Sequence, residues 1–153
     1  MTRAKTWALV TNGVRARILP ALEEGATAEP QELVSKAKST HLRDILSDKA
    51  GRSFSSDSSG RRSAMEPGSD PILRDMQDFA QETLAVLGDH FHAGRLTQLA
   101  VFASPKMLGI LRQEMPSDLR SAVVLERDLN LINLPEADLR ETVVKAFREG
   151  ASA

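Results

Sequence analysis

The residues with the strongest chemical signature lie in one polar segment, residues 47–70, where arginine and lysine alternate with serine and glycine. Its cationic side chains and its one aromatic ring are Lys49, Arg52, Phe54, Arg61 and Arg62. Cationic groups combined with backbone and hydroxyl donors can contact phosphates. An exposed aromatic ring can stack on a base, which is worth about 1–3 kcal/mol. The segment is therefore a candidate contact site for RNA or for a protein partner.

The same composition also fits a loop without a binding role. Few apolar residues occur between residues 47 and 70, and unstructured loops longer than about 12–15 residues are usually either functional or disordered. In a disordered loop the arginines would keep the segment in solution, and Phe54 would pack against the domain. We expect a long mobile loop and keep both interpretations open.

Two arginines form a second candidate site on a predicted strand. Arg15 and Arg17 alternate with apolar residues over residues 14–18, so they are expected on the face opposite the core. If that face is open, they could contact a ligand. If a helix covers it, they would lie at its rim or pair with acids such as Asp75 or Asp78.

Arg127 and Asp128 form a third candidate site, because with Glu126 they lie at the end of a short apolar strand. Open α/β sheets place ligand crevices at the carboxyl ends of their strands. A small-molecule site there would lie near Thr11, Ser104 and Asp128. The alternative is a charged turn at the exit of the strand.

The sequence offers no recognisable catalytic constellation. It contains no cysteine, which excludes thiol nucleophiles, disulfides and zinc sites that need thiolates. The first strand carries no carboxylate of the kind that two-metal nucleases require, and no nucleophile elbow or phosphate-binding glycine motif is present. His90 and His92 are two residues apart near a helix end and are expected in solvent. We therefore expect a protein that is not an enzyme and uses no cofactor or metal.

Composition indicates one ordinary domain spanning residues 1–153. Hydrophobic residues make up 41% of the chain, and 20 basic residues face 21 acidic ones for a net charge of -1. A chain of this length buries roughly 68–70% of its unfolded surface, enough for its own core. Near-zero charge argues against a general polyanion binder, although residues 1–19 and 36–62 are locally basic.

No segment has the length of a signal-peptide core or of a membrane span. The apolar run at residues 7–10 is too short for the former, and no run approaches 18 apolar residues. We therefore expect a cytoplasmic protein without membrane insertion.

Hydrophobic periodicity predicts five strands and three main helices. The strands are predicted at 7–10, 14–18, 31–36, 99–103 and 123–125, and the helices begin at Pro71, Pro105 and Pro135. Thr11-Asn12-Gly13 predicts a hairpin between the first two strands. Asp70 before Pro71 predicts a helix N-cap, and Gly94 ends that helix.

The order β-β-β-α-β-α-β-α predicts a three-layer α/β domain with a mixed five-stranded sheet. The known arrangement with this series is ribonuclease H-like. Its strand order is 3-2-1-4-5, with strand 2 antiparallel to its neighbours.

Several segments together resemble the bacterial host-attachment protein family, whose members are described as required for attachment to host cells. The segments are Trp7–Arg17, Gly51–Phe54, Gly60–Arg62, Ala103–Arg112 and Glu126–Leu129. The likeness spans nearly the whole chain. It implies a protein involved in host attachment, with no mechanism attached to the name.

That family is in turn similar to the middle domain of archaeo-eukaryotic peptide-chain release factors. In those factors the loop after the third strand carries a Gly-Gly-Gln tripeptide. The matching segment, residues 47–70, contains no Gly-Gly-Gln, so peptide release is not expected. The resemblance still implies a relationship to translation or to RNA contact.

Three functional hypotheses follow. The first is a non-enzymatic cytoplasmic interaction protein that contributes, indirectly, to attachment to host cells. The second is an RNA- or ribosome-binding accessory factor that uses the 47–70 loop. The third is an enzyme or small-molecule binder with a site at the carboxyl ends of the strands. The sequence does not determine the oligomeric state.

Overall fold

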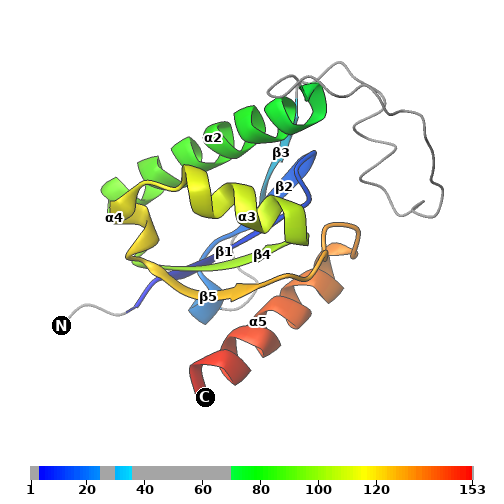
Figure 1. Cartoon of the computed structure of the whole chain (residues 1–153). Coiled ribbons are helices and arrows are strands. Elements are labelled where there is room, and N and C mark those ends of the chain that lie inside the picture. Colours follow the sequence, from blue (N-terminus) through cyan, green and yellow to red (C-terminus); the bar gives the residue numbers. More distant parts are fainter. Residues whose placement is uncertain (1–3, 25–29, 36–69, 153) are drawn as a thin grey trace.

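The computed structural model describes residues 4–24, 30–35 and 70–152, which build one mixed sheet flanked by helices (Figure 1). The strands are β1 (Thr6–Thr11), β2 (Arg15–Leu19), β3 (Gln31–Val34), β4 (Gln98–Ala103) and β5 (Val123–Arg127). They lie in the order β3-β2-β1-β4-β5. β2 runs antiparallel to β1 and β3, whereas β4 runs parallel to β1 and β5. The predicted strand order and the reversed second strand are confirmed.

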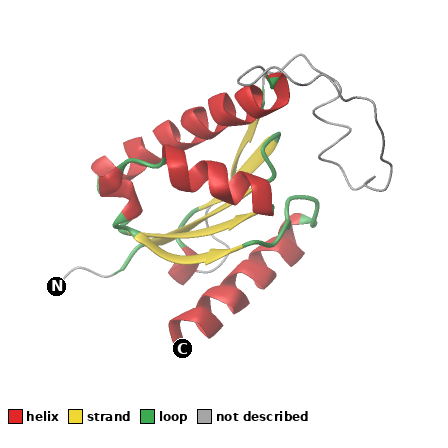
Figure 2. Cartoon of the chain, viewed as in Figure 1, coloured by secondary structure: helices red, strands yellow, loops and turns green. Residues whose placement is uncertain are grey.

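The helices lie on both sides of the sheet and make three layers (Figures 1 and 2). They are α2 (Pro71–His92), α3 (Pro105–Glu114), α4 (Ser117–Arg120) and α5 (Glu136–Ser152), and a 3₁₀ turn, η1, covers Leu22–Glu24. α2, α3 and α4 cover one face, and α5 covers the other. The three long helices are the predicted ones. α4 and η1 were not predicted, because elements of three or four residues are too short to show a hydrophobic period.

Each face of the sheet has its own hydrophobic core. Beneath α2 and α3, the fully buried Ile18 and Leu99 pack with Met76, Phe79 and neighbouring side chains. On the α5 side, the core residues are Ala8, Val10, Ala100, Phe102, Leu139 and Val143, all with no exposed surface. Both faces of the central strands are therefore covered, which explains why these strands are almost continuously apolar.

The termini of α2 follow the predicted signals. The Asp70 carboxylate accepts hydrogen bonds from the backbone N–H groups of Ile72 and Leu73, both at 3.1 Å, and Pro71 occupies the first turn. Gly94 follows the helix with a φ of +78°, a backbone conformation in which glycine has no steric penalty. These caps fix where the longest helix begins and ends.

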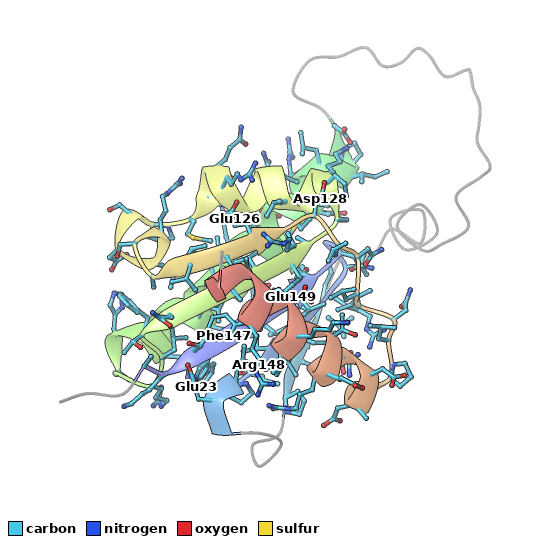
Figure 3. The ribbon with its side chains drawn as sticks, turned by 90° about the horizontal axis from the view of Figure 1, so that it is seen from below. Glu23, Glu126, Asp128, Phe147, Arg148 and Glu149 are labelled. Carbon is cyan, nitrogen blue, oxygen red and sulfur yellow. The ribbon has the colours of Figure 1, made fainter. Side chains whose placement is uncertain are left out.

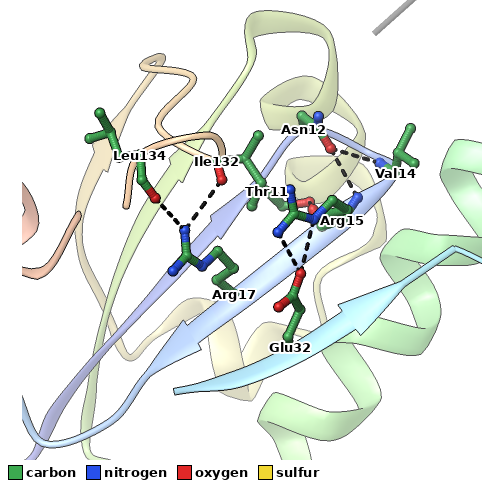
Figure 4. Close-up of polar contacts among 8 residues, drawn as sticks. All are labelled: Thr11, Asn12, Val14, Arg15, Arg17, Glu32, Ile132 and Leu134. Carbon is green, nitrogen blue, oxygen red and sulfur yellow. Dashed lines mark hydrogen bonds and ion pairs between the residues drawn. The ribbon is translucent and has the colours of Figure 1, made fainter. Parts of the chain in front are cut away.

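The turn between β1 and β2 is held by side chains of its own residues (Figure 4). The Asn12 Oδ1 atom accepts the N–H groups of Val14 and Arg15, both at 2.9 Å. The Thr11 hydroxyl donates to the Arg15 carbonyl at 2.8 Å. Gly13 has a φ of +94°. The predicted hairpin is thus confirmed, and its polar turn residues act as internal caps.

Candidate functional site

The five residues of the principal predicted contact site fall outside the described residues. They are Lys49, Arg52, Phe54, Arg61 and Arg62. Their role therefore stays a prediction from the sequence. The other candidates, Arg15, Arg17, Arg127 and Asp128, all lie on described elements or directly after them.

The carboxyl ends of the parallel strands β1, β4 and β5 lie at one edge of the sheet. β1 and β4 are neighbours, but after β1 the chain turns into β2, whereas after β4 it enters α3. Such a divergence is the topological switch point at which open α/β sheets bind ligands. The two strand ends are linked there, because the Ser104 N–H donates to the Thr11 carbonyl at 3.3 Å.

A surface pocket of about 340 Å³ lies at this edge, between the start of α3 and the end of β5. It is lined by Pro105, Leu108, Arg112, Glu126, Arg127 and Asp128. Figure 3 labels Glu126 and Asp128 on the strand and its exit. The predicted Arg127 and Asp128 thus lie at one pocket. Arg112, which was not among the predicted site residues, also lines it.

The charged groups of this pocket partly neutralise one another. Arg112 donates from Nε and Nη2 to Glu126 Oε1, at 2.9 and 2.8 Å. Arg127 donates from Nη1 to the Glu126 backbone carbonyl at 3.0 Å, while Asp128 is exposed. The pocket therefore offers the Arg112 guanidinium and the carboxylates of Glu126 and Asp128 to a polar ligand, whereas the Arg127 guanidinium lies near Gly150 on α5.

Ser104 at the start of α3 has an unusual polar environment. It is the N-cap residue of this helix, but its side chain does not cap the backbone N–H groups. Its Oγ atom is buried and has no hydrogen-bond partner among the described residues. The N–H groups in the first turn of a helix have no partner within the helix. In α2 the Asp70 side chain accepts two of them, whereas no side chain caps those of α3.

Arg15 and Arg17 lie on the α5 side of the sheet and are both held in place (Figure 4). Arg15 donates from Nε and Nη2 to Glu32 Oε2 on β3, at 2.9 and 2.6 Å. Arg17 Nη1 donates to the backbone carbonyls of Leu134 and Ile132, at 2.7 and 3.4 Å. Arg17 therefore fixes the segment that enters α5.

The suggested pairing of these arginines with Asp75 or Asp78 is wrong. Both aspartates belong to α2, which covers the opposite face of the sheet. Because opposed residues of antiparallel strands share a face, Glu32 on β3 is the acid within reach, directly opposite Arg17. Arg17 and Glu32 also line a smaller pocket of about 270 Å³, together with Pro30 and Glu136.

His90 and His92 were expected to be solvated, but both contact other side chains. His92 has an exposed side chain, yet its Nε2 lies 2.6 Å from Asp118 Oδ2 on α4. A hydrogen bond from His92 lowers the pKa of Asp118, and the Leu119 N–H lowers it further. His90 is half-buried beside Trp7, at a ring-centroid distance of 4.6 Å. No pattern in the sequence predicts these partners, because they come from distant elements.

Two further features concern metals and membranes. Among residues 4–24, 30–35 and 70–152, no three histidine, aspartate or glutamate side chains gather closely enough to hold a metal ion. Within the same ranges, no helix has the length and apolar character that crossing a bilayer requires.

Comparison with known proteins places the chain at the level of a family. No curated protein matches the chain. The family described as "Protein required for attachment to host cells" matches residues 7–143. The matched range contains β1 except its first residue, the other four strands, α2, α3 and α4, and the first part of α5. Since the match extends over most of the sequence, this chain belongs to the family of proteins required for attachment to host cells.

Proposed function

We propose that this protein is a non-enzymatic interaction protein of the cytoplasm that contributes indirectly to attachment to host cells. The observation that carries the proposal is the family match over residues 7–143, which includes nearly all of the sheet and the pocket between α3 and β5. An indirect role means that the protein binds a cellular partner, and that this partner acts on the cell surface.

The side-chain pairing supports an interaction role. Charged groups that could serve an acid–base reaction instead hold neighbouring elements together. Examples are Arg112–Glu126, which joins α3 to β5, and His92–Asp118, which joins α2 to α4. Such pairs on the surface fix a shape that a partner can recognise, while each contributes little stability alone.

A deletion strain tests the attachment role. Loss of the gene should reduce the number of cells bound to host cells, and the wild-type gene supplied in trans should restore binding. Unchanged attachment in the deletion strain would contradict the proposal. Cell fractionation tests the location separately, because a protein found mainly outside the cell would contradict a cytoplasmic, indirect role while leaving the attachment role intact.

A second candidate function is binding of a small polar molecule in the pocket between α3 and β5. The specific observation in its favour is that Arg112, Glu126 and Asp128 line a pocket of about 340 Å³ at the edge of the sheet where its parallel strands end. Native mass spectrometry of protein purified under mild conditions should then show a retained ligand. The ligand should be lost in Asp128→Ala and kept in Arg74→Ala, a control on the exposed side of α2.

RNA or ribosome binding stays a hypothesis from the sequence and from the resemblance to release-factor middle domains. Its residues lie between 49 and 62, outside the described part of the chain. Replacing Arg52, Arg61 and Arg62 with alanine should weaken co-sedimentation with ribosomes, most visibly at low salt. If the wild-type protein never co-sediments with ribosomes, this hypothesis fails.

A further inference from the structure

Asn12 and Gly13, in the turn between β1 and β2, form an Asn-Gly pair, the sequence context in which asparagine deamidates most readily. Asparagine side chains are among the thermally unstable groups of proteins, and a following glycine has no side chain to hinder ring closure. Asn130 and Asn133 are exposed, but each is followed by leucine, which slows the reaction. Asn12 is therefore the asparagine at which deamidation should occur.

Deamidation takes place between two groups of this turn. The Gly13 backbone nitrogen loses its proton and forms a bond with the Asn12 side-chain carbon, Cγ. The Cγ–Nδ2 bond breaks, and Nδ2 leaves as ammonia with the proton that balances the reaction. Water then opens the resulting succinimide ring on either side, which gives aspartate or isoaspartate at position 12. The turn controls the reaction if it holds the nitrogen or the carboxamide in place.

The Gly13 nitrogen is held by Thr11. Its N–H donates to the Thr11 hydroxyl oxygen at 3.1 Å, and this hydrogen bond is buried. The acceptor oxygen is itself fixed, because the Thr11 hydroxyl donates to the Arg15 carbonyl at 2.8 Å and the residue has no exposed surface. A base in solution therefore does not reach the Gly13 proton until this hydrogen bond opens.

The Asn12 carboxamide is held by two backbone N–H groups. Its Oδ1 atom accepts from Val14 and Arg15, both at 2.9 Å, and the side chain is buried (Figure 4). Ring closure requires the carboxamide to turn so that Cγ meets the Gly13 nitrogen, and both hydrogen bonds oppose this rotation. The two reacting groups are thus restrained independently of each other.

We propose that Asn12 is a deamidation site that the β1–β2 turn keeps unreactive and that becomes reactive when the turn opens. The modified fraction then records how long a molecule has spent with this turn open. Isoaspartate adds a carbon atom to the main chain and moves the carbonyl that supplied Oδ1 into it, so a molecule that carries isoaspartate cannot rebuild the turn. Chemical modification of this kind makes unfolding irreversible.

The rates of deamidation in the folded protein and in the unfolded chain test the proposal. The protein is kept at mildly alkaline pH, with and without denaturing guanidinium chloride, and is then digested with trypsin, which releases residues 6–15 as a single peptide. Mass spectrometry of this peptide detects the mass increase that deamidation causes. The folded protein should deamidate at least about tenfold more slowly than the unfolded chain, because it reacts only while the turn is open.

Thr11→Val tests whether the turn itself provides the protection. Valine has the shape of threonine but no acceptor oxygen, so the buried Gly13 N–H loses its partner. The folded variant should deamidate roughly 5- to 150-fold faster than the wild type, the factor that corresponds to the loss of such a partner. Thr11→Ser, the matched control, keeps the oxygen and should react at a rate closer to that of the wild type than to that of Thr11→Val. In guanidinium chloride all of these proteins should react equally, because Asn12 and Gly13 are unchanged.

Hydrogen exchange at Gly13 provides a measurement that does not depend on any variant. Exchange of this N–H and deamidation both require its hydrogen bond to Thr11 to open, so low concentrations of guanidinium chloride should raise both rates in the wild-type protein by the same factor. Asn130 and Asn133 serve as internal controls and should react slowly in both states. Equal deamidation of Asn12 in the folded and unfolded protein would overturn the proposal, as would an Asn12 that stays unreactive in the unfolded chain.

Discussion

Replacing Asn12 tests whether its side chain stabilises the β1–β2 turn. Its Oδ1 atom accepts the N–H groups of Val14 and Arg15, both at 2.9 Å, and the residue is only 6% exposed. Asn12→Ala removes the acceptor and adds no group that could replace it. The two N–H groups would then be left without a partner, and water reaches them poorly.

The expected loss of stability follows from these two hydrogen bonds. A buried donor without a partner costs about 1–3 kcal/mol. The Val14 N–H is buried and belongs to the upper part of this range, whereas the Arg15 N–H is partly buried and belongs to the lower part. Together they predict a loss of about 2–4 kcal/mol in the free energy of unfolding. With a urea dependence of about 2 kcal/mol per molar, the midpoint should fall by roughly 1–2 M.

Urea denaturation followed by circular dichroism measures this difference. Asn12→Asp is the matched control, because its carboxylate retains two acceptor oxygens and can form charge-assisted hydrogen bonds with the same N–H groups. It should lose less than half as much stability as Asn12→Ala. The reasoning is refuted if Asn12→Ala costs less than about 0.5 kcal/mol, or if Asn12→Asp is as unstable as the alanine variant.

Three further predictions concern the core, a helix surface and an ion pair. Phe102→Ala should cost about 3–5 kcal/mol in urea denaturation, because the ring is fully buried between β4 and α5; a cost below 1 kcal/mol would contradict this packing. Gly109→Ala should stabilise the protein by about 0.5–1 kcal/mol, since the residue is exposed in α3 and no atom lies within 4 Å of an added Cβ. A loss of stability there would indicate a contact that the structure does not contain. Asp118 should titrate below 3.8 in NMR spectra, and His92→Gln should raise its pKa. The stabilisation from this pair is present above the ordinary carboxyl pKa and is lost as pH falls through the lowered one.

Gly109 lies inside α3, where a glycine is unfavourable. A glycine inside a helix costs about 0.8–1 kcal/mol relative to alanine, which suggests that a neighbouring element needs the space. The side of α3 that carries Gly109 instead faces solvent. The cost of this residue is therefore not explained by packing among the described residues.

The order of the five strands and the three long helices could be predicted from the sequence, and so could the buried face of the clearly periodic segments. Alternation along residues 14–18 separated the buried Ala16 and Ile18 from the half-exposed Arg15 and Arg17. Spacings of three and four placed Met76 and Phe79 in the core. Such information is local, because the side-chain periods of strands and helices depend only on the geometry of their own backbone.

Which functional groups meet depends on how the elements pack together. The Arg17 guanidinium contacts the carbonyl of Leu134, 117 residues away, and the pocket joins residues of α3 to the end of β5. His90 likewise meets Trp7 and Gln31 from two separate strands. These contacts depend on which face each helix covers and on the register between strands. The face that a helix covers and the register between strands do not follow from the hydrophobic period of a single segment. The partners of Arg17 and His90 therefore could not be predicted from the sequence.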